Sequence, residues 1–165
     1  PHSIDHIAQL AATEGDARYA IELLWRAGKY ADSTGLREVT PECVRKAAVS
    51  VYPTIRKDVI RSFSLHEKLF LLGVARHFQR TNAAYMSMGE AAEAYAIVCE
   101  EYEEEGRSHT QLWKYVKDLS GLGIIETRLS GAGRRGKTTM IGLPRIPASD
   151  LGEALEKALG GGESE

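Results

Sequence analysis

The sequence predicts a mainly α-helical chain in which a small helical bundle precedes a winged helix-turn-helix domain with a β-hairpin wing. The first observation is spacing: apolar residues recur every three or four positions in successive segments between residues 4 and 122. The second is a series of serine-based helix starts at Ser64, Ser87 and Ser108. The third is a change, after residue 123, to two β-type runs around a Gly/Arg-rich turn. Helices followed by a hairpin give the element order of a winged helix.

The composition is that of a globular protein with one domain or two small ones. The chain has 165 residues, of which 43% are hydrophobic and 27% are charged. These values argue against a disordered, collagen-like or disulfide-scaffold protein, and no apolar run reaches the roughly 18 residues of a membrane span. The opening PHSIDHIAQL has neither the basic nor the apolar segment of a signal peptide, and it lacks an initiator methionine. We therefore expect a processed product or a piece of a longer protein.

The first region, residues 1–53, is predicted to contain short helices separated by glycine and proline. Apolar spacing predicts one helix at the start and a second that is capped by Asp16 and ends at Gly35. Thr-Pro-Glu at positions 40–42 is a strong start for a third helix, because it combines an N-cap hydroxyl, a proline at the first helical position and an acid in the first turn. Pro53 is expected to break that helix.

Residues 54–63 are predicted to form a linker helix, and residues 64–145 the winged helix. Each serine box there precedes an apolar helical pattern. One face of its third helix is predicted to pack on the core through Leu112, Tyr115, Val116, Leu119 and Leu122. The opposite face carries Thr110, Lys114 and Lys117, with Gln111 and Trp113 at its flanks. Two cations and a hydroxyl at this spacing can lie along a DNA groove.

The hairpin is predicted from residues 124–129 and 138–143, which are β-like and flank a turn. The tip of this wing combines three glycines with the three cations Arg134, Arg135 and Lys137. Glycine allows close backbone approach, and arginine suits phosphate contact and a narrow minor groove. The remaining residues, 146–165, are predicted to be a peripheral C-terminal tail with a weak helix.

Positive charge is concentrated in the same region. The whole chain is close to neutral, with 21 basic and 23 acidic side chains. Residues 107–145, in contrast, carry eight basic and two acidic side chains. Such a segment favours a polyanionic partner, although a solvated basic face has the same composition.

Two motifs match catalytic patterns without the structural context that those patterns need. Residues 131–138 match the GxxxxGK[ST] phosphate loop letter for letter, but that loop precedes a helix, whereas residues 139–143 are β-like. His66 and Glu67 begin a zinc-protease pattern, but Phe70 stands where the second histidine belongs. We therefore expect a wing rather than a nucleotide site, and no zinc site.

Neither the acidic residues nor the cysteines indicate a metal centre. The run from Glu100 to Glu105 is predicted to be a solvated helix end. Cys43 and Cys99 form no C-x-x-C pattern and lie inside helical patterns. They are predicted to be buried, reduced thiols of a cytosolic protein.

Several segments resemble AAA+ replication initiators. The run GDARYAIELLWRAGKYA at 15–31 resembles their second-sensor segment, where a G-D-x-R start opens a helix ending in a basic-A-G-x-x-A element. The run VTPECVRKA at 39–47 resembles the next helix of the ATPase lid. Residues 65–143, including LGII at 122–125, resemble the C-terminal winged helix of the archaeal origin-recognition/Cdc family, relatives of the eukaryotic origin recognition complex subunits. The resemblance covers about residues 4–145.

The resemblance implies roles that the residues alone do not give. It makes Arg18 the second-sensor arginine, a catalytic residue that reaches the γ-phosphate of ATP held with Mg²⁺ by an AAA+ core elsewhere in a longer chain. Without that core, the chain is expected neither to bind ATP nor to hydrolyse it. The pair Leu112-Trp113 departs from the polar pairs that are frequent in the family. DNA contacts are expected from Thr110, Gln111, Lys114, Lys117, Arg134, Arg135 and Lys137.

We therefore interpret the chain as the DNA-binding portion of an archaeal replication initiator, with residues 1–53 as the lid. The winged helix would bind duplex origin DNA, and the lid would couple this binding to whether ATP or ADP is bound. The implied partners are double-stranded DNA, the AAA+ core, other initiator copies and the replicative helicase, in the cytoplasm at the nucleoid and away from membranes. Three other interpretations remain open: a transcription regulator with an N-terminal dimerisation domain, a winged helix that binds only proteins, and a small NTPase.

Overall fold

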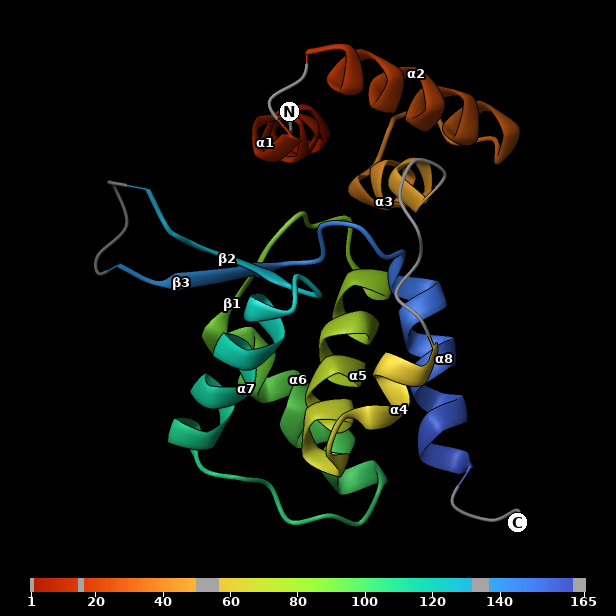
Figure 1. The fold of residues 1–165 in the computed structure, drawn as a ribbon. Coiled ribbons are helices and arrows are strands. Elements are labelled where there is room, and N and C mark those ends of the chain that lie inside the picture. Colours follow the sequence, from red (N-terminus) through yellow and green to blue (C-terminus); the bar gives the residue numbers. More distant parts are fainter. Residues whose placement is uncertain (1, 15–16, 50–56, 132–136, 162–165) are drawn as a thin grey trace.

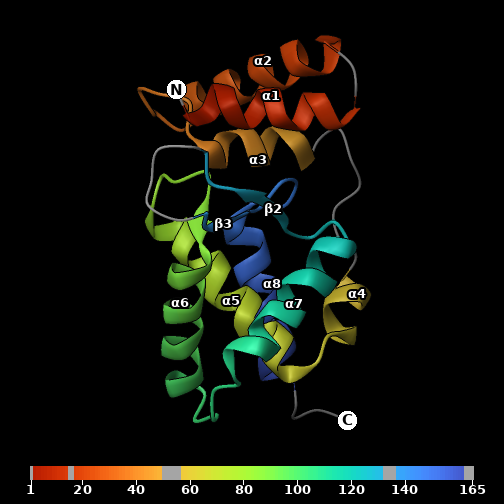
Figure 2. The ribbon, with the colours of Figure 1, turned by 90° about the vertical axis from the view of Figure 1, so that its left-hand side faces the viewer.

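The chain folds into an N-terminal bundle stacked on a larger helical unit that carries a small sheet (Figure 1). This computed structural model describes residues 2–14, 17–49, 57–131 and 137–161. The N-terminal bundle lies over the sheet, and the remaining helices lie on the sheet's other side (Figure 2). The predicted fold class, mainly helical with a winged helix, is confirmed.

The N-terminal bundle consists of α1 (His2–Glu14), α2 (Ala17–Ser33) and α3 (Pro41–Val49). The predicted start of α3 is confirmed, because the Thr40 hydroxyl accepts the Cys43 N–H at 3.4 Å. Gly35 follows the end of α2 with a φ of +72°, a conformation that glycine adopts without strain. The core of this bundle is small and rich in alanine: Ile7, Leu10, Tyr19, Leu23, Ala27, Ala31, Cys43, Val44, Ala47 and Ala48. The predicted cap Asp16 and breaker Pro53 lie outside the described residues.

The larger unit consists of α4 (Lys57–Ser62), α5 (Leu65–Arg80), β1 (Met86–Ser87), α6 (Met88–Glu101), α7 (His109–Gly121), β2 (Glu126–Leu129), β3 (Thr139–Gly142) and α8 (Ala148–Gly160). Complete capping boxes begin α5 and α6, as predicted: Ser64 exchanges hydrogen bonds with Glu67, and Ser87 with Glu90. At α7 only half of the box forms, because Ser108 accepts the Gln111 N–H without a reciprocal bond.

The sheet has three antiparallel strands in the order β1-β3-β2, which is one strand more than the predicted hairpin. Ile141 pairs with Met86 on one side and with Thr127 on the other. The sequence does not reveal β1, because two residues give no alternation pattern and the strand depends on pairing with β3. The element order helix, short strand, helix, helix, hairpin is that of a winged helix.

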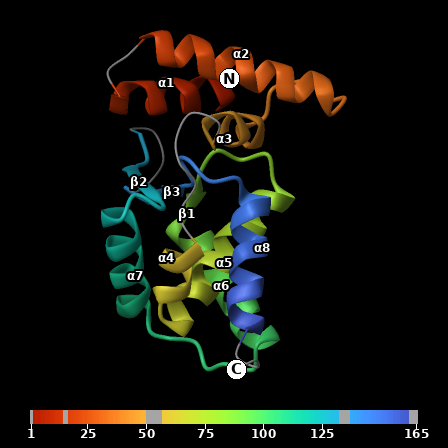
Figure 3. The ribbon, with the colours of Figure 1, turned by 45° about the vertical axis from the view of Figure 1, so that its right-hand side comes forward.

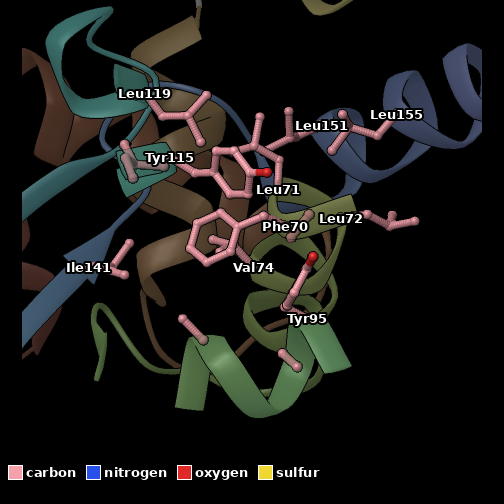
Figure 4. Packing of buried hydrophobic residues seen from close by; sticks show 14 of the residues in the cluster. Phe70, Leu71, Leu72, Val74, Tyr95, Tyr115, Leu119, Ile141, Leu151 and Leu155 are labelled. Carbon is pink, nitrogen blue, oxygen red and sulfur yellow. The ribbon is translucent and has the colours of Figure 1, made fainter. Parts of the chain in front are cut away.

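The core of the winged helix is one continuous apolar cluster that reaches from Ile60 to Leu155. Figure 4 shows Phe70 and Leu71 of α5 packed with Tyr115 and Leu119 of α7, while Leu151 and Leu155 approach from α8. Helices α5 and α6 come very close at Gly73, where an added Cβ would lie 3.0 Å from the Ala94 backbone. Glycine is therefore required at that position for packing.

Two predictions about the edge of this core are wrong. The C-terminal segment is not peripheral, because α8 packs along α5 and α4 and its side chains Leu151 and Leu155 are completely buried (Figure 3). Leu122 does not belong to the inner face of α7, because it follows the last helical residue and is 62% exposed.

Candidate nucleic-acid interface

The outer face of α7 presents polar and cationic side chains to solvent. Thr110, Lys114 and Lys117 are all exposed, as are Gln111 and Trp113 at the flanks. The inner residues Leu112, Tyr115, Val116 and Leu119 are buried and fix the helix to the core. The predicted division of the helix into two faces is thus confirmed, except at Leu122.

Gln111 keeps its side chain out of the helix cap. Its backbone N–H donates to the Ser108 hydroxyl at 3.4 Å, but its side-chain amide makes no return bond to Ser108. The amide on the first turn is therefore not used in a capping box, and an amide of this kind can bond bidentately to adenine.

Trp113 and His109 form a pair that the sequence prediction did not include. The indole Nε1–H of Trp113 donates to Nε2 of His109 at 2.9 Å. The two rings meet edge to face, with an interplanar angle of 84°. Both side chains are exposed at the N-terminal half of α7. The spacing of four residues on one helix is the signal that could have revealed this contact.

The wing extends from the sheet beside α7 (Figures 1 and 2). Lys137 is exposed and lies two residues before Thr139, where the returning strand β3 begins. Arg134 and Arg135, predicted to sit at the tip, lie outside the described residues. The structure therefore places one of the three predicted wing cations.

The phosphate-loop match does not have a phosphate-loop structure around it. The residues after Lys137 form strand β3, so no helix N-terminus faces the motif. The expectation that the residues after the motif are β-like is confirmed for Thr139–Gly142, whereas residues 132–136 of the motif lie outside the described residues. The acidic run likewise forms the end of α6 and the turn after it, where Glu101 pairs with Arg76.

A polar junction connects α1 to the base of the wing; it consists of Gln9, Tyr85, Glu126 and Arg128. The Tyr85 hydroxyl contacts Gln9 Oε1, and it lies 3.0 Å from Glu126 Oε1. Arg128 on β2 stacks its guanidinium on the Tyr85 ring, 3.8 Å from the centroid, and reaches Gln9 at 3.4 Å. Gln9 lies 76 positions from Tyr85 and 119 positions from Arg128 in the sequence, so no local sequence signal could have predicted this junction.

The proton count in this junction limits which bonds can coexist. A hydroxyl has one proton and an amide oxygen only accepts, so both Tyr85 contacts are hydrogen bonds only when Glu126 is protonated and donates to the hydroxyl. Burial raises the pKa of Glu126, while the Tyr85 hydrogen bond and Arg128 oppose that rise. Burial likewise raises the pKa of Tyr85. In this junction, the Glu126 carboxyl and the Tyr85 hydroxyl therefore keep their protons more readily than they would in solvent.

A second contact, the buried arginine cluster, consists of Glu42, Arg45, Phe78, Leu143 and Ala148. Arg45 is 1% exposed; its Nε donates to the Leu143 carbonyl at 3.0 Å and its Nη1 to Glu42 Oε2 at 3.1 Å. The same carboxylate oxygen accepts the Ala148 N–H at 3.2 Å, at the start of α8. The guanidinium also lies 4.5 Å from the centre of the Phe78 ring. Two side chains of α3, Arg45 and Glu42, thus bind the residue after β3 and the start of α8.

Comparison with known families identifies both halves of the molecule. A family model described as "CDC6, C terminal winged helix domain" matches residues 58–152, and one described as "Cdc6 AAA+ ATPase-type lid domain" matches residues 1–49. The chain belongs to the Cdc6/ORC1 family. The N-terminal bundle is its lid, and the larger unit is its winged helix.

Archaeal relatives agree with this membership. The chain is 37% identical, over 78% of its length, to "ORC1-type DNA replication protein 2" of Saccharolobus solfataricus. It is 38% identical, over 82% of its length, to the protein of the same name from Sulfurisphaera tokodaii. It covers 32% and 33% of these relatives, so the chain spans about a third of their length.

Solved structures of the Cdc6/ORC1 family have the same fold. The Cdc6p structure from Pyrobaculum aerophilum superposes with a TM-score of 0.79 at 39% identity, covering 89% of this chain and 37% of that one. The Aeropyrum pernix ORC1 protein in complex with DNA has a TM-score of 0.55 at 30% identity, covering 98% of this chain and 41% of that one. The second of these structures is described as a complex with DNA, the class of ligand predicted here.

In the Cdc6-type lid, Arg18 lies on the first turn of α2 and is exposed. Its guanidinium is therefore accessible from outside the bundle, as a phosphate-sensing role would require. Cys43 and Cys99 are buried and free, as predicted. Within the described ranges, none of the helices combines the length and apolar character needed to cross a bilayer.

Proposed function

We propose that this chain is the DNA-binding portion of an archaeal replication initiator and recognises duplex origin DNA through α7 and the wing. The observation that carries the proposal is the exposed outer face of α7, where Thr110, Lys114 and Lys117 point away from an apolar inner face. The strands of the wing lie next to α7 (Figure 2). A relative of this fold solved in complex with DNA adds support.

The exposed side chains divide into two roles. Thr110 and Gln111 lie on the first turn of α7, the part of a recognition helix that reaches base edges. Lys114 and Lys117 follow one and two turns later, where a point charge suits the phosphate backbone. Arg134, Arg135 and Lys137 of the wing contact phosphates or the adjacent minor groove.

A salt titration tests the proposal. Binding to fluorescently labelled duplex DNA is measured by anisotropy over a range of KCl concentrations. The logarithm of the binding constant should fall linearly with that of the salt concentration, and each lost phosphate contact should lower the slope by about 0.9. We expect Lys114→Ala, Lys117→Ala and an Arg134/Arg135/Lys137 triple alanine variant each to lower it.

Lys157→Ala is the matched control. Lys157 is an exposed lysine on α8, which runs along α4 and α5 rather than beside the wing, and it pairs with Glu153. Removing it changes the net charge by the same amount as Lys114→Ala. A slope that falls equally in this variant, or that stays unchanged in the α7 and wing variants, would contradict the proposed surface.

The proposal for the lid is that Arg18 senses ATP bound, with Mg²⁺, by an AAA+ core of a longer chain. A bound ATP supplies the γ-phosphate charge, and an exposed guanidinium matches it with bidentate, always charged donors. In the full-length protein, Arg18→Ala should slow ATP turnover, whereas Arg37→Ala, at an exposed arginine after the end of the same helix, should not. The 165-residue chain alone should give no heat of Mg·ATP binding by calorimetry. Micromolar binding that Lys137→Ala abolishes would overturn this assignment.

A further inference from the structure

The recognition helix exposes one large aromatic side chain whose only polar atom is already bonded. Trp113 is 39% exposed, although it lies on a helix whose other exposed residues are polar, charged or glycine. Its indole Nε1–H donates to His109 Nε2 at 2.9 Å. Tryptophan has no other hydrogen-bonding group, so the side chain offers a partner only its apolar ring.

The ring lies next to the groups assigned to DNA contact. Trp113 is three residues after Thr110 and four residues before Lys117, so both are its neighbours on the helix surface. A duplex that lies along Thr110 and Lys117 therefore meets the indole ring as well.

The major groove presents one apolar group to such a ring, the 5-methyl group of thymine. The remaining edges of the bases there are hydrogen-bond donors and acceptors, for which Trp113 has no partner left. We propose that Trp113 is a specificity-determining residue that reads thymine methyl groups, and that His109 positions its ring. This inference rests on the proposed DNA-binding function and adds the chemistry of one contact to it.

His109 acts on the orientation of the ring. Its Nε2 can accept the indole N–H only when the imidazole is neutral and carries its proton on Nδ1. The edge-to-face packing of the two rings, with centroids 6.1 Å apart, adds a second contact. The two contacts hold the indole in one orientation before DNA arrives, which reduces the entropy lost on binding.

The experiment removes the methyl groups from the DNA. A duplex library with a randomised centre is first selected on the whole chain, and the selected sequence is then made in two forms, with thymine and with deoxyuridine. The chain should bind the thymine form more tightly, roughly fourfold for each contacted methyl group, as expected for one methyl group leaving water. Trp113→Ala should bind both forms alike, and Trp113→Phe should keep part of the preference.

The matched control is Lys117→Ala, which should weaken binding to both forms and leave their ratio unchanged. Equal binding of the two forms by the unmodified chain would overturn the inference, and so would an unchanged ratio in Trp113→Ala. These outcomes differ from a failure of the proposed function, in which the chain shows no salt-sensitive binding to either duplex and this inference fails with it.

The role of His109 has its own readout. The chain has two tryptophans, so Trp25→Phe leaves Trp113 as the only indole fluorophore. In that background His109→Leu should lower the fluorescence anisotropy of the free protein and reduce the thymine preference. His109→Gln, which restores an acceptor, should recover both. An unchanged thymine preference in His109→Leu would show that His109 does not position the ring.

Discussion

The lid and the winged helix are stabilised in different ways. The winged helix has one large apolar core, and its buried polar side chain His66 has a partner, the Tyr95 hydroxyl at 2.8 Å. That hydroxyl also accepts the Arg107 N–H at 2.9 Å. The lid has a small, alanine-rich core, and its buried polar residues His6 and Arg45 lie toward the winged helix.

This difference shows which part depends on the other. Arg45 makes its buried backbone bond to Leu143 of the winged helix, and the carboxylate beside it accepts the N–H that starts α8. The two ring nitrogens of His6 have no hydrogen-bond partner among the described residues. The buried His66 of the winged helix is bonded within that unit, whereas the buried Arg45 of the lid is bonded to the winged helix. Polar contacts between the lid and the winged helix therefore fix the position of the lid.

The largest expected effect comes from separating the two regions. Residues 57–165 contain the entire core of the winged helix and should fold alone with a cooperative urea transition. Residues 1–49 have only the small cluster and fall near the size at which an isolated domain fails to fold. Circular dichroism of the two pieces checks this. A cooperative transition in the 1–49 piece would mean that the lid does not depend on the winged helix.

The second test breaks the buried arginine cluster. Arg45→Met keeps the length of the side chain but leaves Glu42 without its cation, so the lid should lose about 3–5 kcal/mol of stability. Urea denaturation followed by lid fluorescence from Trp25 measures the loss. Arg26→Met is the control, because its pair with Glu22 is exposed and contributes about 0.5 kcal/mol or less. Equal losses of stability in the two variants would mean that the buried arginine cluster stabilises the lid no more than an exposed ion pair does.

The third test uses pH. Burial, with a smaller contribution from Arg45, lowers the pKa of His6 to about 3. In the unfolded chain a histidine titrates near 6.5, so below that pH the unfolded state binds the extra proton and folding stability falls. The slope from His6 should approach about 1.4 kcal/mol per pH unit, or about 2 kcal/mol lost by pH 5.

His6→Leu removes this titration and isolates it from the other histidines. Burial also lowers the pKa of His66 and His77, so the chain keeps a pH dependence in the winged helix after the substitution. The difference in the free energy of unfolding between the two proteins should be constant above pH 7 and should change by about 2 kcal/mol between pH 7 and pH 5, because only the unmodified chain loses the His6 contribution. A difference that stays constant down to pH 4 would mean that His6 can be protonated in the folded lid.

The sequence predicted the elements whose signals are local. Serine boxes gave the starts of α5 and α6, and the two-faced pattern of α7 correctly separated Lys114 and Lys117 from the core. It missed β1, because a two-residue strand has no periodicity, and it predicted the helix of α8 without its burial, which depends on packing against α5 and α4.

The interface between the regions could not be predicted for the same reason. From the sequence alone, Arg45 would be taken for one more surface cation on a short helix. Only the fold places its guanidinium against the Leu143 carbonyl. Tyr85 and Gln9 likewise meet because α1 crosses the base of the wing. Family resemblance identified the lid and the winged helix, but the contacts between them depend on geometry that residue spacing does not contain.

The smallest expected effect tests the polar junction. Tyr85→Phe removes the hydroxyl shared by Gln9 and Glu126 but keeps the ring on which Arg128 stacks, so the attachment of the lid should weaken by about 1 kcal/mol. Gln9→Ala should have a similar effect, and the two losses should not add, because both remove the same bond. A double-mutant cycle in urea measures this coupling. Additive losses would mean that Gln9 and Tyr85 do not act through one shared bond, and no loss in either single variant would mean that this junction does not hold the lid.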